Sequence, residues 1–204
     1  MKASIRKTSG DRREEIEQTA LDLAYLHTPQ KVSTGMIAAR LGLTQPAIYK
    51  HFPSKQDIWR AVGENLAEKI RNNISLGTKS RAAPVSNLKQ LVLAQLELIS
   101  QNPALPELLL MRVEAGGSAD CQMTIQSAIS DFQLELEANL HLAVKDNTLT
   151  KNLNVQDAAL LIMGVIQSSI LRMIVRRDPG VLQKDGPRLL DLLLAGFART
   201  GEKA

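Results

Sequence analysis

The chain is poor in aromatic residues. Its 204 residues include one Trp, two Tyr and three Phe, and aromatics make up only 3% of the sequence. The apolar content is nevertheless 44%, so material for a sizeable core is present and must consist mainly of Leu, Ile, Val, Ala and Met. Because straight-chain side chains lose little rotamer freedom in a helix, this composition favours helices over strands.

Cysteine is almost absent as well. Cys121 stands alone, which excludes an intramolecular disulfide and a metal cluster built on cysteines. The amino-terminal stretch MKASIRKTSG lacks the apolar core of a signal peptide. The longest uninterrupted run of apolar or small residues, 158–166, is far shorter than the ~20 residues that span a membrane. We therefore expect a soluble, cytoplasmic protein without a metal or cofactor.

An excess of positive charge is present, and it lies entirely in the first 60 residues. This segment holds ten Lys or Arg and six Asp or Glu, whereas the remaining 144 residues hold fifteen of each sign. A localised basic excess indicates a polyanionic partner for that part of the chain. A few solvated lysines would give the same count, so this interpretation needs support from a motif.

Apolar residues recur at helical spacing along most of the chain, and no segment shows the alternation typical of a strand. Asp11 and Glu14 fit a capping box at the start of the first helix. Phe52 and Trp59 are expected in the core. We predict an all-α fold of about nine helices, at 12–26, 34–41, 45–52, 55–76, 87–100, 103–114, 120–144, 155–177 and 186–200.

Residues 33–52 read as two short helices joined by a tight turn. Ser33 caps the first helix, Gly42 supplies a left-handed residue at its end, and Thr44 caps the second. Pro46 lies in the first turn of the second helix, where a missing N–H loses no hydrogen bond. Two short helices joined by a glycine-containing turn are typical of the helix-turn-helix motif, whose second helix enters the major groove of DNA.

This segment resembles the tetracycline-repressor (TetR) family of bacterial transcription regulators over roughly residues 12–65. The resemblance is carried by Ser-Thr-Gly-Met-Ile-Ala at 33–38, Leu-Gly-Leu-Thr at 41–44, Ile-Tyr-Lys-His-Phe-Pro-Ser-Lys at 48–55, and Ile58. It implies a homodimer that binds a palindromic operator in double-stranded DNA, as a repressor released by a small-molecule effector. We expect a basic arm at 1–10, a DNA-binding domain at 11–65, and a helical domain for ligand binding and dimerisation at 66–204.

The resemblance also implies roles in DNA binding. Gln45 is the expected base reader, because its amide can pair twice with an adenine edge. Tyr49 and His51 are expected on phosphates, with local packing as the alternative for each. Gly35 departs from relatives that carry a long side chain there, and it cannot read a base. The expected DNA-contacting residues are Thr34, Thr44, Gln45, Pro46, Ala47, Tyr49, Lys50, His51 and Lys55.

The last two long helices are apolar on more than one face. A helix without a polar face must be covered on both sides, and this indicates a homodimer through 155–177 and 186–200, as in the family. A monomer with a thick core is the alternative. The expected interface residues are Leu161, Val165, Ile166, Ile170, Leu190, Leu193, Leu194 and Phe197.

Members of the family commonly hold their effector among the central helices. Polar or pliable residues on these helices are the candidates for such a pocket. Two short stretches, 11–16 and 102–105, are similar instead to nucleoid-occlusion members of the family, which take a protein or DNA signal. The candidate effector contacts are Met111, Arg112, Glu114, Gln126, His141 and Gln167.

Two other classes of protein remain as alternatives, an enzyme and a helical adaptor without affinity for DNA. Against an enzyme, His27, His51 and His141 lie far apart in the sequence, and Cys121 has no evident partner. The sequence contains no glycine-rich phosphate loop and no metal-ligand spacing. The basic excess coincides with the helix-turn-helix segment, which favours a DNA-binding regulator over both alternatives.

Overall fold

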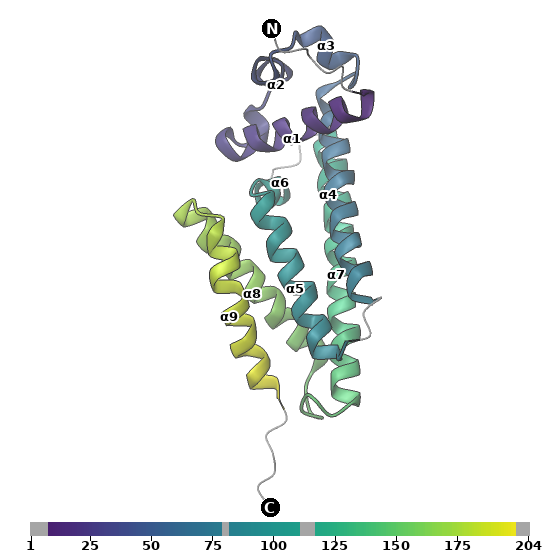
Figure 1. Ribbon diagram of the computed structural model, residues 1–204, viewed down its shortest axis with the longest axis vertical. Helices are drawn as coiled ribbons and strands as arrows, with labels where there is room; N and C mark the ends of the chain where they lie inside the picture. The colour runs from purple at the N-terminus through teal and green to yellow at the C-terminus, as the bar shows by residue number, and fades with distance from the viewer. Residues whose placement is uncertain (1–7, 79–81, 111–116, 199–204) are drawn as a thin grey trace, which may run out of the picture. The chain divides into compact units, whose positions relative to one another are not determined.

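The computed structural model describes residues 8–78, 82–110 and 117–198, and in these ranges the chain is helical (Figure 1). The predicted all-α class is confirmed, since the described extended pairing is limited to an isolated bridge between Leu149 and Ala198. The elements in these ranges are α1 (Ser9–His27), the 3₁₀-helix η1 (Pro29–Lys31), α2 (Thr34–Leu41), α3 (Gln45–Tyr49), α4 (Lys55–Thr78), α5 (Pro84–Gln101), α6 (Leu105–Leu110), α7 (Gly117–Lys145), α8 (Val155–Arg176) and α9 (Gly180–Phe197).

Several helix boundaries differ from the sequence prediction. The capping box of α1 uses Thr8 and Asp11, one turn before the predicted pair of Asp11 and Glu14. The Thr8 hydroxyl accepts from the Asp11 amide, and the Asp11 carboxylate accepts from the Thr8 amide, so Asp11 occupies the third helical position rather than the cap. Helix α9 begins at Gly180 rather than Gly186, and it carries Pro187 inside the helix.

The described part of Met1–Ala67 and the segment Ala104–Gln126 form one compact unit. Its core includes both aromatic residues predicted there, Phe52 at 0% and Trp59 at 4% exposure. Helix α1 contacts α2, η1 and α6, and α2 contacts α3. The largest fully buried side chains of this unit are Ile16, Ile37, Ile48, Phe52, Ile58 and Leu66.

Within this unit α4 and α7 approach each other closely at Gly63 and Cys121. A Cβ atom on Gly63 would lie 2.7 Å from the Cα atom of Cys121, so no larger residue fits there. Burial raises the pKa of the Cys121 thiol to about 12. The thiol therefore stays protonated at neutral pH and serves as a small apolar side chain in this contact.

Residues Glu68–Pro103 and Ser127–Ala204 form the second unit, as far as they are described. Helix α9 packs between α5 and α8, and a Cβ atom on Gly186 would lie 2.4 Å from Leu96 Cδ1. Ion pairs join neighbouring helices at the surface of this unit. They are Arg71 with Asp131, Lys89 with Asp191, and Arg172 with Asp185.

Among the described residues, α8 alone is long and apolar enough to cross a membrane by length and composition. The prediction from uninterrupted apolar runs did not detect this, because polar side chains such as Gln167 interrupt the helix. A core or interface helix of a protein that does not enter a membrane meets the same criterion. Leu161, Leu171 and Val175 of α8 are 53%, 62% and 75% exposed, so part of its apolar surface has no cover within the chain.

Candidate nucleic-acid interface

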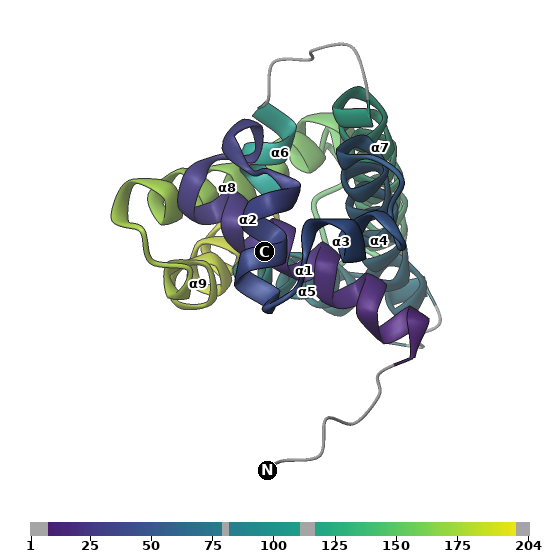
Figure 2. The same cartoon turned by 90° about the horizontal axis from the view of Figure 1, so that it is seen from above.

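Helices α2 and α3 are joined by a three-residue turn that begins at Gly42. The Ser33 hydroxyl caps α2 by accepting from the Met36 amide at 3.2 Å, as predicted. Gly42 has φ +66°, the left-handed conformation expected of it, and the Leu43 amide then donates to the Ala38 carbonyl at 2.8 Å. The turn redirects the chain sharply into α3, and Figure 2 shows α2 and α3 from above.

Helix α3 has five residues, and its start differs from the prediction in one respect. Thr44 has the extended conformation of a cap residue but makes no side-chain capping bond. Pro46 lies in the first turn, as predicted, and it removes one of the amides that a cap would satisfy.

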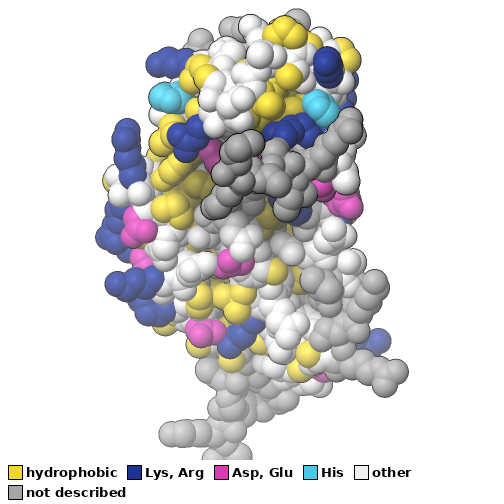
Figure 3. All heavy atoms as spheres, turned by 45° about the horizontal axis from the view of Figure 1, so that its top comes forward, with side chains coloured by type: hydrophobic (Ala, Val, Ile, Leu, Met, Phe, Trp, Pro, Cys, Tyr) yellow, Lys and Arg dark blue, Asp and Glu magenta, His cyan; other side chains and the backbone are white. Residues whose placement is uncertain are grey.

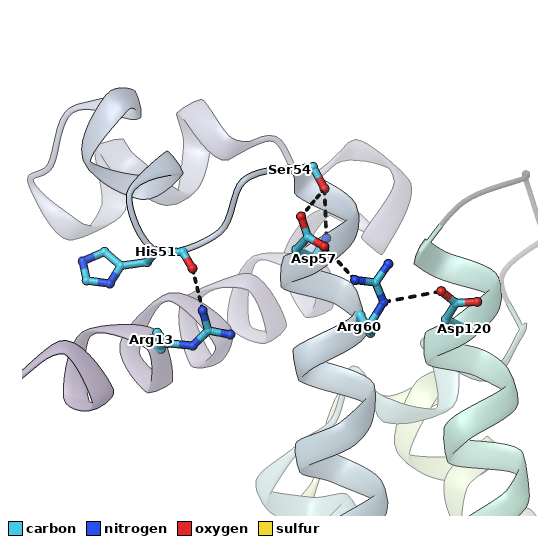
Figure 4. A network of polar contacts seen from close by, with 6 residues as sticks. All are labelled: Arg13, His51, Ser54, Asp57, Arg60 and Asp120. Carbon is cyan, nitrogen blue, oxygen red and sulfur yellow. Dashed lines mark hydrogen bonds and ion pairs between the residues drawn. The ribbon is translucent and has the colours of Figure 1, made fainter.

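The carboxy-terminal end of α3 is held by α1. Ile48 and Phe52 are fully buried and anchor the segment in the core. Arg13 donates from Nη1 to the His51 carbonyl oxygen at 2.5 Å, and its guanidinium carbon lies 4.0 Å from the centre of the Phe52 ring (Figure 4). One arginine therefore satisfies a carbonyl at the end of α3 and covers an aromatic ring beneath it.

The residues predicted to contact DNA differ in exposure. Thr44, Gln45, Pro46, Tyr49 and Lys50 are exposed, and Tyr49 retains 43% of its surface. Three others, Ala47, His51 and Lys55, are half-buried. Thr34 is buried, with an exposed fraction of 5%. Figure 3 shows Lys, Arg and His side chains distributed around this part of the surface.

The Thr34 hydroxyl lies within a small polar cluster that sequence reasoning did not find. Gln45 donates from Nε2 to Thr34 Oγ1 at 2.7 Å, and Tyr49 Oη lies 3.3 Å from the same oxygen. The three residues belong to α2 and α3, and only the spacing of Gln45 and Tyr49 on one helix face was visible in the sequence.

The start of α4 carries a second polar network (Figure 4). The Ser54 hydroxyl accepts from the Asp57 amide at 3.2 Å and donates to its carboxylate at 2.7 Å. This bond and the Arg60 guanidinium lower the pKa of Asp57. Arg60 also lies 3.5 Å from Asp120 of α7, so it bridges two carboxylates. Lys55 donates to the Gln30 carbonyl at 3.1 Å, which ties α4 to η1.

The candidate effector contacts fall into two groups. Met111, Arg112 and Glu114 lie outside the described residues. The other three, Gln126, His141 and Gln167, are exposed. Sequence reasoning missed two buried amides on α5, Asn87 and Gln95, whose side-chain oxygens have no hydrogen-bond partner among the residues that the structure describes.

A groove runs between α8 and α9, which lie side by side (Figure 1). Four of the predicted dimer residues, Leu161, Val165, Leu193 and Phe197, line it. Three others, Ile166, Leu190 and Leu194, are buried in the chain's own core, and Ile170 is half-buried. The remaining lining residues are Gly164, Ser168, Leu189, Leu192 and Gly196.

A short exposed helix, set by a glycine turn and anchored by two preceding helices, defines a helix-turn-helix DNA-binding protein. In the described ranges no three His, Cys, Asp or Glu side chains are grouped so that they could hold a metal. Residues 16–62 match the family model described as "Bacterial regulatory proteins, tetR family". Over these residues the chain carries a helix-turn-helix domain of the TetR type.

Comparison with whole proteins extends the similarity beyond this domain. The chain is 24% identical over 168 residues to the nucleoid occlusion factor SlmA of Shewanella halifaxensis (strain HAW-EB4), covering 80% of this chain and 83% of that protein. The ketosteroid transcriptional regulator KstR2 of Mycobacterium tuberculosis has a TM-score of 0.76 at 17% identity, with coverage of 97% and 98%. The transcriptional regulator FadR of Bacillus subtilis, in complex with stearoyl-CoA, has a TM-score of 0.71 at 16% identity, with coverage of 90% and 98%. At these identities the solved structures establish the fold.

The contact of Arg13 with α3 leads to a stability prediction. Arg13→Lys keeps the charge but loses the planar guanidinium that stacks on Phe52, so we expect the free energy of unfolding to fall by about 1 kcal/mol. Urea denaturation measures this change. Arg12→Lys is the matched control, because Arg12 pairs with Glu15 on the same helix at 2.8 Å and lysine keeps the charge of that pair. Equal losses at the two positions would contradict the role assigned to Arg13.

Proposed function

We propose that this protein is a sequence-specific regulator that binds a palindromic operator as a homodimer through α3. The observation that carries this proposal is the exposed polar edge of α3, with Gln45 at its amino-terminal end and Tyr49 one turn later. The first residues of a recognition helix are those that reach base edges in the major groove. The basic excess of the first 60 residues fits the phosphate backbone of the same ligand.

Each DNA contact is argued from the chemistry and exposure of its side chain. The Gln45 amide is exposed and presents a donor and an acceptor, the pair that adenine requires. Pro46 and Ala47 offer apolar surface for thymine methyl groups. The residues proposed to meet phosphates, or a base edge in the case of Lys50, are Thr44, Tyr49, Lys50, His51 and Lys55.

Replacing the proposed base reader tests the function directly. Gln45→Ala should weaken binding to the preferred duplex by about 1–3 kcal/mol and leave binding to random duplex almost unchanged. The preferred duplex is obtained by selection from a random library, and affinities are measured by fluorescence anisotropy. Gln90→Ala, an exposed change on α5, is the control. An equal loss on preferred and random DNA would show that Gln45 does not read bases.

The proposed dimer uses the groove between α8 and α9. Gly164 and Gly196 open onto it, and a Cβ atom added at either would meet nothing within 4 Å. Glycines at such positions allow two helices to approach closely, and the exposed Leu161 and Leu192 would be covered by the partner. A two-fold dimer of this kind would present two copies of α3 to half-sites about 34 Å apart.

Filling the groove tests the dimer without disturbing the chain's own packing. Gly164→Leu should weaken dimerisation about five-fold or more, because overpacking an interface costs about 1–3 kcal/mol. Sedimentation equilibrium gives the dimer dissociation constant, and circular dichroism confirms that the helices are retained. Ala138→Leu adds a similar side chain to an exposed position of α7 and should leave the constant unchanged. A dimer of unaltered strength in Gly164→Leu would place the interface elsewhere.

The proposal includes a small-molecule effector whose binding releases the protein from its operator. Support comes from FadR, whose structure contains stearoyl-CoA. The candidate contacts remain Met111, Arg112, Glu114, Gln126, His141 and Gln167, to which the structure adds the two buried amides of α5. Unpaired amide oxygens of this kind accept hydrogen bonds, so a ligand that reached them would carry hydroxyl or amine donors. We place the protein in the cytoplasm, where the chromosome lies.

A second candidate function, nucleoid occlusion, is favoured by the similarity to SlmA over most of both chains. In that case the dimer would bind DNA at many places and act on a protein partner rather than on a promoter. The two functions share the same DNA interface and differ in the distribution of their sites.

Genome-wide mapping of bound sites in the native host separates the two candidates. A regulator is expected to occupy a small number of sites next to promoters, and its loss should change transcription of the adjacent genes. An occlusion factor is expected to occupy many sites dispersed over the chromosome without regard to promoters. Dispersed binding with no transcriptional change would reject the promoter-directed function.

A further inference from the structure

We propose that Thr34 is a positioning residue whose hydroxyl couples base reading by Gln45 to phosphate binding by Tyr49. The inference rests on the proposed function, in which Gln45 meets a base edge and Tyr49 meets the backbone. It adds that the base contact of Gln45 and the phosphate contact of Tyr49 strengthen each other. The residue responsible belongs to α2, although the contacts it governs belong to α3.

The geometry joins the three side chains through one oxygen atom. Thr34 Oγ1 accepts from Gln45 Nε2 at 2.7 Å and lies 3.3 Å from Tyr49 Oη. Gln45 and Tyr49 are four residues apart on α3, so both side chains project from the same helix face. Thr34 is 5% exposed and both partners are exposed, so the hydroxyl lies behind the surface that DNA would meet.

The anchor itself is fixed. Thr34 is the first residue of α2, whose start is held by the Ser33 cap. Ile37 and Ala38 of the same helix are buried at 1% and 3% exposure. The position of the hydroxyl is therefore set by the core, whereas the amide of a free surface glutamine would rotate about a broad terminal torsion.

The hydrogen-bond inventory shows why this contact assists base reading rather than competes with it. A glutamine amide has two N–H donors and one carbonyl acceptor. One N–H is taken by Thr34, and the other N–H and the carbonyl oxygen remain. These two groups are the pair that adenine N7 and N6 require. The protein thus holds Gln45 in an orientation suited to the base before DNA arrives, which lowers the entropy lost on binding.

The remaining proton of Thr34 extends the chain to Tyr49. Because Thr34 Oγ1 accepts from Gln45, its own proton is available to the Tyr49 phenol oxygen. The Tyr49 proton is then free to be donated to a phosphate oxygen. Hydrogen bonds that run in one direction polarise one another, so the phosphate contact strengthens the bond that orients Gln45.

A threonine that only filled space would be replaceable by valine, which has nearly the same shape. This difference gives the experiment. Affinities for the selected duplex and for a scrambled duplex of the same composition are measured for the full-length protein and three variants: Gln45→Ala, Tyr49→Phe, and both together. The set is repeated with Thr34→Val, with Thr34→Ala in case valine prevents folding, and with Thr34→Ser, which keeps the hydroxyl.

In the native background we expect the effects of Gln45→Ala and Tyr49→Phe on the selected duplex to be non-additive by about three-fold or more. Thr34→Ser should retain this coupling, and Thr34→Val or Thr34→Ala should reduce it to about one-fold. Thr34→Val should also lower affinity for the selected duplex more than for the scrambled one. A coupling factor that survives the loss of the hydroxyl overturns the inference.

Failure of the proposed function gives a different pattern. If Gln45→Ala weakens binding to the selected and scrambled duplexes equally, Gln45 is not a base reader and the inference falls with it. If Gln45→Ala abolishes the preference while the coupling is insensitive to Thr34, base reading stands and only the role of Thr34 is rejected.

Discussion

The anchoring of α3 is the constraint on which the rest of the structure depends. A helix of five residues does not hold its conformation in water, because nucleation costs more than so few hydrogen bonds return. The conformation is imposed from outside by the left-handed turn at Gly42, the burial of Ile48 and Phe52, and the bond from Arg13 to the His51 carbonyl. These contacts bury the inner face of α3, and Gln45 and Tyr49 remain exposed at the surface.

The same unit ties α3's successor, α4, to a distant part of the chain. Gly63 brings the α4 backbone against Cys121 of α7, and Arg60 bridges Asp57 and Asp120 beside it. Close helix packing and a charged bridge hold this part of α4 against α7, and the packing involves backbone as well as side chains. Both α4 and α7 continue along the chain into the second unit.

The apolar character of α8 has a physical explanation in this arrangement. Ala158, Ile162 and Ile166 face the chain's own core, whereas Leu161 and Gly164 face the groove beside α9. One helix therefore presents two apolar sides, and the second side is open in the single chain. Apolar surface of this extent on a helix pair is typical of an interface between protein chains. It also explains why α8 meets a composition criterion for crossing a membrane.

Local signals in the sequence by themselves determined the all-α class, the Ser33 cap, the turn at Gly42 and the family resemblance of the DNA-binding domain. They succeeded because capping, left-handed glycine and helical periodicity act within a few residues. They misplaced the cap of α1, where Thr8 and Asp11 lie one turn apart and either can serve as a cap, and the start of α9, where Pro187 lies inside the helix rather than at its beginning. Only the tertiary structure decided that the Thr34 hydroxyl meets Gln45 and Tyr49 and that Arg13 holds α3. It also decided that three of the predicted dimer residues, Ile166, Leu190 and Leu194, are buried in the chain's own core. These depend on side chains brought together from distant segments, for which local periodicity contains no information.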